Sequence, residues 1–208
     1  MDTSTLSCQV KFIPNFIDAE TASNLFQVLK NDYLLNDEFL SSQPEALQIP
    51  EVRKVMFMDK ELFSENVLPP EHWGNTAPWF EALEAIRYRV EQELQWAFHT
   101  GVCLYYRNGQ NSMDFHSDYE AFGSTEVIAS ISLGAERLFQ LRDIRTKEVY
   151  EELLPHGSLF VMGKGCQENY EHALARNPEC SEPRINITFR TFRHETQNLH
   201  LWQNSTNH

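Results

Sequence analysis

The sequence predicts an α+β fold in which helices come first and a run of short strands follows. From Pro78 to about His99, apolar residues recur at three-to-four spacing, which is typical of a helix. The stripe consists of Trp79, Leu83, Ile86, Val90, Leu94 and Phe98. After Gly101, which we expect to end this helix, the hydrophobic period changes to two, as in strands. This order favours an antiparallel sandwich or barrel as the core.

The elements before the long helix are less strongly marked. Lys11 to Pro14 predicts a short first strand, and Asp18 predicts the N-cap of a helix near 18–30. Residues 31–50 are polar and contain proline, so we expect a loop there. Residues 52–57 have strand character. Prolines and a glycine in 64–76 predict irregular structure.

The second half of the chain is predicted to be mostly strands. The candidates are 102–107, 126–133, 137–142, 147–150, 158–162 and 184–192. Turn signals separate them at Asn108-Gly109, Gly134-Ala135 and His156-Gly157. The residues from His194 to His208 are polar and lack periodicity, which indicates a loosely held tail.

Length and composition indicate one folded domain. The chain has 208 residues, of which 41% are hydrophobic and 12% aromatic. No apolar run approaches the roughly 20 residues of a membrane span, so we expect no membrane partner. The start of the chain lacks the basic and apolar stretches of a signal peptide, so we expect a cytoplasmic protein. We also expect a monomer. The four cysteines form no C-x-x-C pair, which predicts reduced thiols.

The net charge of −13 argues against a general affinity for nucleic acid, because phosphate binders usually carry a basic footprint. The first fifty residues carry only two cations, Lys11 and Lys30. One loose basic cluster exists, at Arg142, Arg145 and Lys147. A local basic groove remains compatible with the negative total.

His116, Asp118 and His172 are candidate metal ligands. Two histidines and a carboxylate form the facial triad that binds non-haem Fe(II). An H-x-D pair alone arises easily by chance, and on its own it would fit a solvated loop. A rival interpretation is a structural zinc held by Cys166, His172 and Cys180, although the spacing fits no familiar zinc finger.

The run from Arg184 to Arg190 strengthens the metal hypothesis. In a strand, Ile185, Ile187 and Phe189 would form one apolar face, and Arg184, Asn186, Thr188 and Arg190 would form the polar face. An ordinary half-exposed strand could also show this pattern. Two arginines on a buried face would require a buried anion. Next to an iron site, such a strand suggests an oxygenase with a dicarboxylate co-substrate.

These motifs, taken in order, resemble the AlkB-like branch of the Fe(II)/2-oxoglutarate dioxygenases. The resemblance runs from about Val52 to Arg193 and is densest from Tyr106 onward. It rests on Tyr106 to Gly109, Asp114 to Glu120, Val127 to Ala135, Arg137 to Arg142, Pro155 to Leu159 and Pro183 to Arg190. It implies a double-stranded β-helix, or jelly roll, with N-terminal helices packed outside. We expect one domain over 1–193, a jelly-roll core at about 101–193, and a tail at 194–208.

The resemblance also implies roles for individual residues. His116, Asp118 and His172 fall on the metal ligands, which are also the catalytic residues of the family. Five residues fall on the 2-oxoglutarate pocket: Tyr106, Arg184, Asn186, Thr188 and Arg190. Glu120 falls where related enzymes place an acidic residue near the target base, and Arg53 falls in the lid over the nucleotide. Phe122 is the preferred stacking aromatic, ahead of Phe57, Trp73 and Trp79.

Two positions depart from the family pattern. Leu104 stands where many relatives have an asparagine, two residues before the pocket tyrosine. Leucine cannot hydrogen-bond a co-substrate, so that contact is lost or replaced. Val52 stands where relatives often carry a proline before the lid arginine.

The implied activity is oxidative N-demethylation of alkylated bases in DNA or RNA, a reaction of alkylation-damage repair. It uses Fe(II), 2-oxoglutarate and O2, and it releases formaldehyde, succinate and CO2. Two alternatives remain open from the sequence. The same chemistry could act on a protein side chain or a small metabolite, which the net charge of −13 favours. The chain could also be a non-catalytic jelly-roll binding module.

Overall fold

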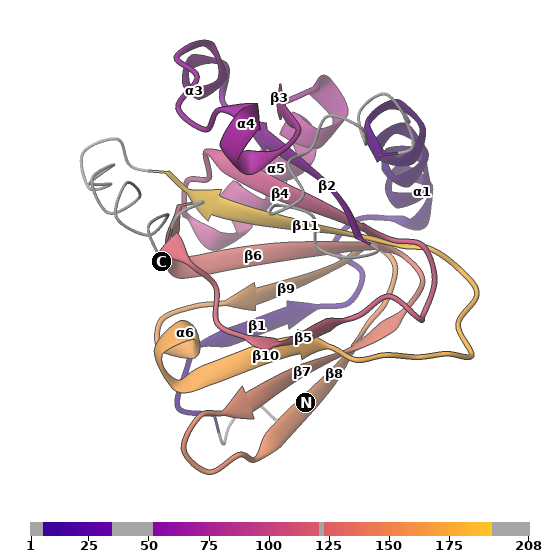
Figure 1. Cartoon of the computed structure of the whole chain (residues 1–208), viewed down its shortest axis with the longest axis vertical. Coiled ribbons are helices and arrows are strands. Elements are labelled where there is room, and N and C mark those ends of the chain that lie inside the picture. Colours follow the sequence, from indigo (N-terminus) through magenta and orange to yellow (C-terminus); the bar gives the residue numbers. More distant parts are fainter. Residues whose placement is uncertain (1–5, 35–51, 121–122, 193–208) are drawn as a thin grey trace.

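Two β-sheets face each other, and most helices cover the outer face of the larger one (Figure 1). The computed structural model describes residues 6–34, 52–120 and 123–192. The larger sheet has the strand order β1 (Val10–Ile13), β9 (Ser158–Met162), β6 (Ser124–Gly134), β11 (Arg184–Thr191), β4 (Thr100–Tyr106), β2 (Val52–Met58) and β3 (Thr76–Pro78). The smaller sheet has the order β5 (Met113–His116), β10 (Tyr170–Leu174), β7 (Arg137–Asp143) and β8 (Val149–Leu154).

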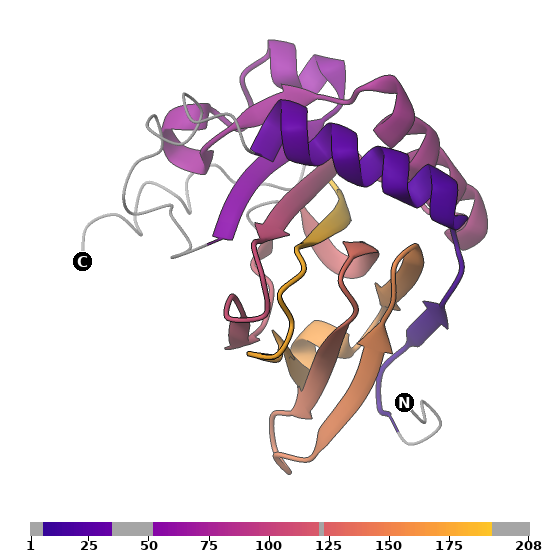
Figure 2. The same cartoon turned by 90° about the vertical axis from the view of Figure 1, so that its right-hand side faces the viewer.

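The helices belong mainly to the first half of the chain, as predicted. They are α1 (Ala19–Val28), the π-helix η2 (Leu29–Leu34), α3 (Lys60–Ser64), α4 (Pro70–Trp73), α5 (Glu81–Leu94) and the short α6 (Cys166–Asn169). Figure 2 shows α1 lying across the larger sheet, on the side opposite the smaller sheet. None of the helices in the described ranges is long and apolar enough to span a membrane.

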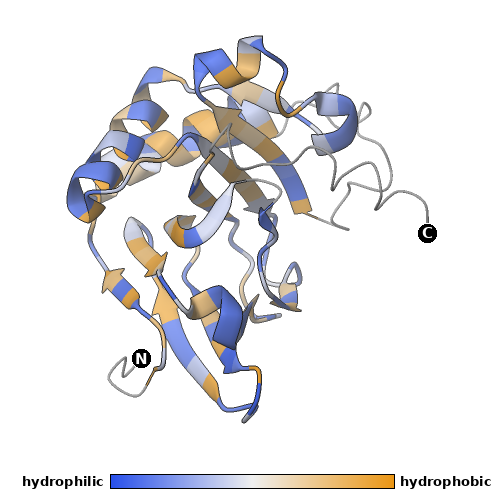
Figure 3. Cartoon of the chain, turned by 90° about the vertical axis from the view of Figure 1, so that its left-hand side faces the viewer, coloured by the Kyte–Doolittle hydropathy of each residue, from blue (hydrophilic) through white to orange (hydrophobic). Residues whose placement is uncertain are grey.

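The larger sheet has an apolar core on each face because strand side chains alternate. On the outer face, Leu25 of α1 and Leu83 and Ile86 of α5 belong to one buried cluster with Ile185 and Ile187 of β11. On the inner face, Ile128, Leu141, Leu154, Phe160, Met162, Cys166 and Tyr170 form a second cluster between the sheets. Figure 3 shows hydrophobic colour along the strands beneath the helices, consistent with a core on that side.

The register of β11 fixes what lies between the sheets. β11 pairs with both β4 and β6, so Arg184 lies between Tyr106 and Gly134, and Asn186 lies between Leu104 and Ser132. The even residues of β11 therefore point inward, and the odd residues join the helix-covered core, as the sequence predicted. The predicted α+β class with an antiparallel sandwich is confirmed.

The long helix is shorter than the apolar stripe suggested. α5 begins at Glu81 and ends at Leu94, where Gln95 adopts a left-handed conformation with φ 52° and ψ 43°. Gly101 does not end the helix but lies within β4. Trp79 lies before α5, is buried, and donates Nε1–H to Asp59 Oδ1 at 2.7 Å. The spacing of Trp79 and Phe98 reflects burial of the segments flanking the helix, not helical structure.

Several other boundaries differ from the prediction. α1 begins after Asp18, whose side chain accepts a hydrogen bond from the Thr21 amide, so this N-cap is confirmed. η2 occupies part of the predicted loop 31–50, and residues 35–51 lie outside the described residues. The region expected to be irregular contains α4 and β3. Strands β5 and β10 were not predicted, because each is short and carries a histidine in place of regular alternation.

Candidate functional site

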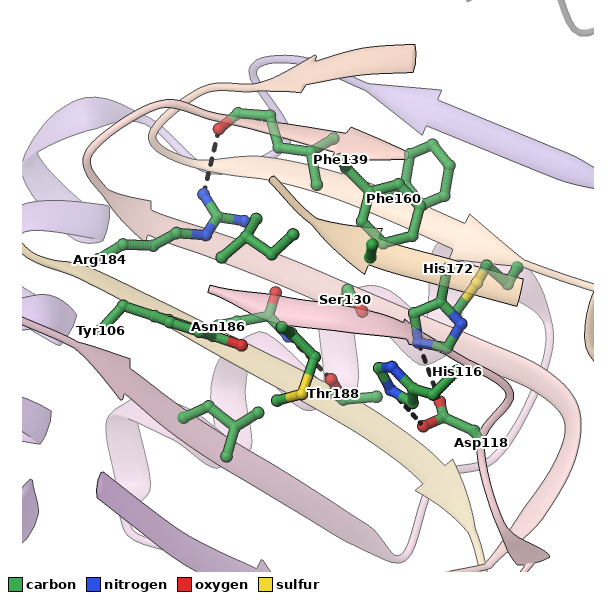
Figure 4. A pocket seen from close by; sticks show the side chains of 16 residues that line it. Tyr106, His116, Asp118, Ser130, Phe139, Phe160, His172, Arg184, Asn186 and Thr188 are labelled. Carbon is green, nitrogen blue, oxygen red and sulfur yellow. Dashed lines mark hydrogen bonds and ion pairs between the residues drawn. The ribbon is translucent and has the colours of Figure 1, made fainter. Parts of the chain in front are cut away.

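A pocket lies between the two sheets and is lined from both. Its empty volume is about 590 Å³, part of it open to solvent, which suits a small molecule. Apolar side chains from β7, β9 and β10 line one part, including Phe139, Phe160 and Leu174. The polar lining residues are Tyr106, His116, Asp118, Ser130, His172, Arg184, Asn186 and Thr188 (Figure 4).

His116, Asp118 and His172 converge at one end of this pocket (Figure 4). His116 ends β5 and pairs directly with His172 of β10, which brings residues 56 positions apart side by side. One ligand atom from each of the three residues lies within 4.8 Å of the others, so the group could hold a metal ion. His116 Nε2 lies 3.8 Å from Asp118 Oδ1, and His172 Nε2 lies 3.9 Å from Asp118 Oδ2.

The protonation states of these residues favour a cation. Burial lowers the pKa of His172 to about 4, an effect that Asp118 opposes and that His116 and Arg190 reinforce. His172 is therefore neutral at pH 7, as a metal ligand must be. Burial alone would raise the pKa of Asp118, but the charge of Arg190 and its hydrogen bond hold that pKa below its usual value. Asp118 is therefore an anion at pH 7.

Neighbouring groups hold the three candidate ligands in place. His116 Nδ1 lies 2.7 Å from the Asp114 carbonyl, so an Nδ1–H would donate to it and leave Nε2 for a metal. The Asp118 amide donates to Gln167 Oε1 at 2.9 Å, and Ser117 Oγ donates to the Tyr170 carbonyl at 3.2 Å. Gln167 lies on α6, far along the chain. No sequence signal identified it, because the contact depends on the register of β10 with β5.

Arg190 is tied to the candidate metal group. Its Nη2 lies 2.7 Å from Asp118 Oδ2, and its Nη1 donates to the Tyr119 carbonyl at 2.7 Å. The Arg190 side chain is 4% exposed and that of Asp118 is 16% exposed, so this ion pair is largely shielded from water. The structure therefore places Arg190 as a direct support of Asp118.

Arg184 lies further along the pocket in a different setting. Its Nη1 donates to the carbonyls of Ala135 and Leu154, and its Nη2 donates to Ser132 Oγ at 2.7 Å. These acceptors are all neutral, and Nε has no hydrogen-bond partner in the described residues. Burial lowers the pKa of Arg184 to about 10, so the guanidinium stays charged at neutral pH. A buried, charged guanidinium among neutral acceptors fits an anionic ligand.

The other residues predicted for the co-substrate also face the pocket. Burial raises the pKa of Tyr106 to about 12, so its hydroxyl keeps its proton and can donate. Asn186 Nδ2 donates to Thr188 Oγ1 at 2.9 Å, which orients both side chains. Leu104, which replaces the family's asparagine, lines the pocket as an apolar residue.

Arg137 is a structural residue whose role the sequence did not indicate. Arg137 is 1% exposed, and its guanidinium donates to the backbone carbonyls of Asn108, Gly109, Asn111 and Ala175. It therefore joins the turn after β4 to the segment after β10. Both of those strands carry pocket residues, so Arg137 fixes the spacing of the pocket walls.

The residues predicted for the substrate are less clearly placed at the pocket. Glu120 is exposed and follows the metal group by two residues. Arg53 lies on β2, and its side chain donates to the Leu34 carbonyl at 3.1 Å. It is not among the residues that line the pocket. Phe122 lies outside the described residues. Phe57, Trp73 and Trp79 are buried in apolar clusters, so burial explains them without a ligand.

The alternative zinc site finds no support in the geometry. Cys166 Sγ lies 2.8 Å from Cys8 Sγ, and Cys180 Sγ contacts the Glu182 carbonyl at 3.6 Å. His172 instead belongs to the group with His116 and Asp118. Within the described ranges, that group is the one set of three or more possible ligands close enough to share an ion.

Comparison with known proteins identifies similar sequences over most of the chain. The sequence profile of the 2OG-Fe(II) oxygenase superfamily matches residues 9–190. The chain is 27% identical over 212 residues to "Alpha-ketoglutarate-dependent dioxygenase alkB homolog 3" of Bos taurus, covering 92% of this chain and 69% of that protein. It is 36% identical over 124 residues to "DNA oxidative demethylase ALKBH2" of Bos taurus. That match covers 54% of this chain and less than half, 44%, of the relative.

A solved structure described as "The structure of OsALKBH1" superimposes with a TM-score of 0.63. It covers 89% of this chain and 99% of its own, at 12% sequence identity. At that identity the similarity concerns the fold alone. With the profile match, it confirms the predicted double-stranded β-helix with helices packed outside.

Proposed function

This chain belongs to the 2OG-Fe(II) oxygenase superfamily, and we propose that it removes N-methyl groups oxidatively from alkylated bases in DNA or RNA. Its predicted AlkB-like membership is confirmed by the relatives named above. The observation that carries the proposal is the group of His116, Asp118 and His172, which opens onto a pocket lined by Arg184. Fe(II) and 2-oxoglutarate are the cofactors typical of this family.

The donor set fits Fe(II), because two neutral imidazoles and one carboxylate are the ligands of the facial triad. When bound, iron and 2-oxoglutarate together supply O2-dependent oxidation of a C–H bond, with succinate and CO2 as co-products. We propose that His116, Asp118 and His172 hold the metal. Arg190 keeps Asp118 ionised and fixes its orientation.

We propose that Arg184 binds a carboxylate of 2-oxoglutarate. Arginine suits this role because its planar fork matches the two carboxylate oxygens. Tyr106 lies beside Arg184 and would donate its hydroxyl proton to the same anion. Asn186 and Thr188 line the stretch between Arg184 and the metal group and would add polar contacts.

The proposed substrate rests on the relatives and on the residues after Asp118. One relative is named a DNA oxidative demethylase. Next to Asp118, Tyr119 is 78% exposed, and Glu120 is exposed as well. An exposed aromatic ring is suited to stacking on a base that has left a duplex or belongs to a single strand.

We propose that the protein works in the cytoplasm as a monomer.

A second candidate function keeps the chemistry and changes the substrate to a protein side chain or small metabolite. The observation that favours it is the net charge of −13, which opposes approach of a polyanion. In the described residues, Arg53, the residue expected to contact a nucleotide, does not line the pocket.

A turnover assay separates these possibilities. The full chain is incubated with Fe(II), 2-oxoglutarate and methylated single- or double-stranded oligonucleotides, and succinate and formaldehyde are both measured. We expect both products in equal amounts from the wild type and neither from His116→Ala. His72→Ala is a matched control, because His72 is exposed on α4.

Each departure from this result has a defined meaning. Succinate without formaldehyde from any oligonucleotide would favour the second candidate. No succinate from the wild type under any condition would refute the enzyme activity and leave a binding module.

A further inference from the structure

Two cysteines that the proposed reaction does not use lie in direct contact. Cys8 Sγ and Cys166 Sγ are 2.8 Å apart, although the residues are separated by 158 positions in the chain. Cys8 precedes β1 and is partly exposed, whereas Cys166 begins α6 and is buried. Neither residue lines the pocket, so this pair is independent of the proposed function.

Backbone hydrogen bonds on both sides of Cys8 hold its thiol next to that of Cys166. Gln9 donates its amide proton to the Lys164 carbonyl at 3.0 Å, and Gly163 donates to the Gln9 carbonyl at 2.8 Å. The Ser7 amide donates to the Tyr170 hydroxyl at 3.0 Å. These contacts lie on both sides of Cys8 and fix its segment against the start of α6. A disulfide has an S–S length of about 2.05 Å, so bond formation requires the sulfurs to approach by less than ~1 Å.

The two sulfurs are chemically unequal. The hydrogen bond from Cys166 lowers the pKa of Cys8, while the hydrogen bond to Cys8 and burial raise the pKa of Cys166. Cys8 is therefore the better thiolate and is also the more accessible of the two. Cys103 is different, because it is fully buried in the core and burial raises its pKa.

We propose that Cys8 and Cys166 are a reversible disulfide site that responds to hydrogen peroxide. The Cys8 thiolate attacks one peroxide oxygen, the O–O bond breaks, and Cys8 sulfenic acid and hydroxide form. The sulfur of Cys166 then attacks the Cys8 sulfur, and the S–O bond breaks. The departing hydroxide takes the thiol proton of Cys166 and leaves as water. The two thiols lose two electrons, and peroxide is reduced to water.

The bond would tether α6 to the segment before β1. Gln167, the residue after Cys166, accepts the hydrogen bond from the Asp118 amide, so α6 also supports the metal group. Asn169 of α6 accepts a hydrogen bond from the Ile144 amide at 2.9 Å. A cross-link here closes most of the chain into one loop and restricts the unfolded state. In a reducing compartment such a bond is transient, and thiol reductants would reverse it.

The test uses the full, reduced chain and stoichiometric hydrogen peroxide. Free thiols are then alkylated in denaturant, so that buried thiols also react, the protein is digested without reductant, and the peptides are measured by mass spectrometry. We expect one cross-linked species joining the Cys8 and Cys166 peptides, with Cys103 and Cys180 alkylated as thiols. The oxidised protein should unfold at a temperature higher by about 5–10 °C. Dithiothreitol should remove both changes.

Two variants make the test decisive. Cys8→Ser changes a partly exposed residue, and it should show neither the cross-link nor the rise in unfolding temperature. Cys180→Ser is the matched control and should behave like the wild type. The proposal is overturned if peroxide leaves Cys8 as a sulfenic or sulfinic acid without the cross-link. A cross-link that forms equally with Cys103 or Cys180 would also overturn it, because it would require an unfolded chain.

Discussion

The two arginines of β11 lie on the same face of the strand, but their surroundings differ, and Arg184 is the one that lines the pocket. Arg190 pairs with the Asp118 carboxylate at 2.7 Å, so its charge is balanced within the chain. Arg184 donates to two backbone carbonyls and one hydroxyl. These acceptors satisfy N–H groups of the guanidinium, but none of them carries a negative charge to neutralise it. Both side chains are almost fully buried.

This difference assigns the two residues different tasks. An arginine that is already paired with a candidate metal ligand orients that ligand and keeps it ionised. An arginine that is buried among neutral acceptors can gain most from an anion that arrives from solution. We therefore expect Arg190 to determine the stability of the metal group and Arg184 to determine affinity for the dicarboxylate.

The largest effect should come from Arg190→Met. It leaves the Asp118 carboxylate without its cation in a largely buried site, and we expect the free energy of unfolding to fall by about 3 kcal/mol. Urea denaturation of the metal-free protein measures this. The double variant Asp118→Asn/Arg190→Met removes both charges and should recover most of the loss. If the double variant is as unstable as the single one, Arg190 contributes mainly by packing.

Arg184→Met should have the opposite profile. It removes a charge that no carboxylate balances in the described residues, so the loss of stability without ligand should be smaller than for Arg190→Met. Affinity for 2-oxoglutarate should fall ~10- to 100-fold, because charge-assisted hydrogen bonds contribute about 1.5–3 kcal/mol. Calorimetric titration measures the affinity. Arg184→Lys keeps the positive charge but lacks the planar guanidinium fork, so its affinity for 2-oxoglutarate should lie between those of the wild type and Arg184→Met. An unchanged affinity in both variants would contradict the assignment.

The sequence predicts that both arginines lie on the same face of β11, because that depends on local periodicity. It does not predict the contrast between them, since it assigned both to the 2-oxoglutarate pocket, and the pairing of Arg190 with Asp118 appears only in the structure. The alternation in β11 predicts which residues face the pocket, and the order of His116, Asp118 and His172 predicts the ligand set. The N-cap at Asp18 is equally local. The alternation in β11 and the N-cap depend on neighbours within a few residues, which a single sequence displays directly, whereas His172 was linked to His116 and Asp118 by the order of motifs along the chain.

The features that could not be predicted depend on register between distant strands. Gln167 reaches Asp118, and Arg137 reaches four backbone carbonyls, only because β10 pairs with β5 and β7. The contact between Cys8 and Cys166 depends in the same way on β1 pairing with β9. The helix boundary at Leu94 was missed because Trp79 and Phe98 are buried outside the helix and continue its apolar spacing.

Gln167→Ala compares two contacts of Asp118: the neutral hydrogen bond with Gln167 and the ion pair with Arg190. It removes the acceptor for the Asp118 amide, and we expect metal affinity to fall by about tenfold, the lower end of effects seen for groups that orient metal ligands. Competition with a fluorescent chelator measures this. Gln140→Ala is the matched control, since Gln140 bonds Glu151 at an exposed position. If Gln167→Ala and Arg190→Met lose the same metal affinity in this assay, the ion pair of Arg190 with Asp118 is not the more important of the two contacts.

Tyr106→Phe should have the smallest effect on affinity, and it tests whether the carboxylate of 2-oxoglutarate lies within reach of the Tyr106 hydroxyl. The Tyr106 hydroxyl lies at the Arg184 end of the pocket and keeps its proton, because burial raises its pKa to about 12. Loss of one hydrogen bond from an uncharged hydroxyl to the anion should cost about 1.5 kcal/mol, the low end for bonds to charged groups, so affinity for 2-oxoglutarate should fall by up to about tenfold. Tyr105→Phe is the matched control. Tyr105 precedes Tyr106 on β4 and faces the helix-covered core, so its hydroxyl cannot reach the same anion. Equal losses in both variants would mean that the effect arises from the packing of β4, and Arg184 would then hold the carboxylate without the tyrosine.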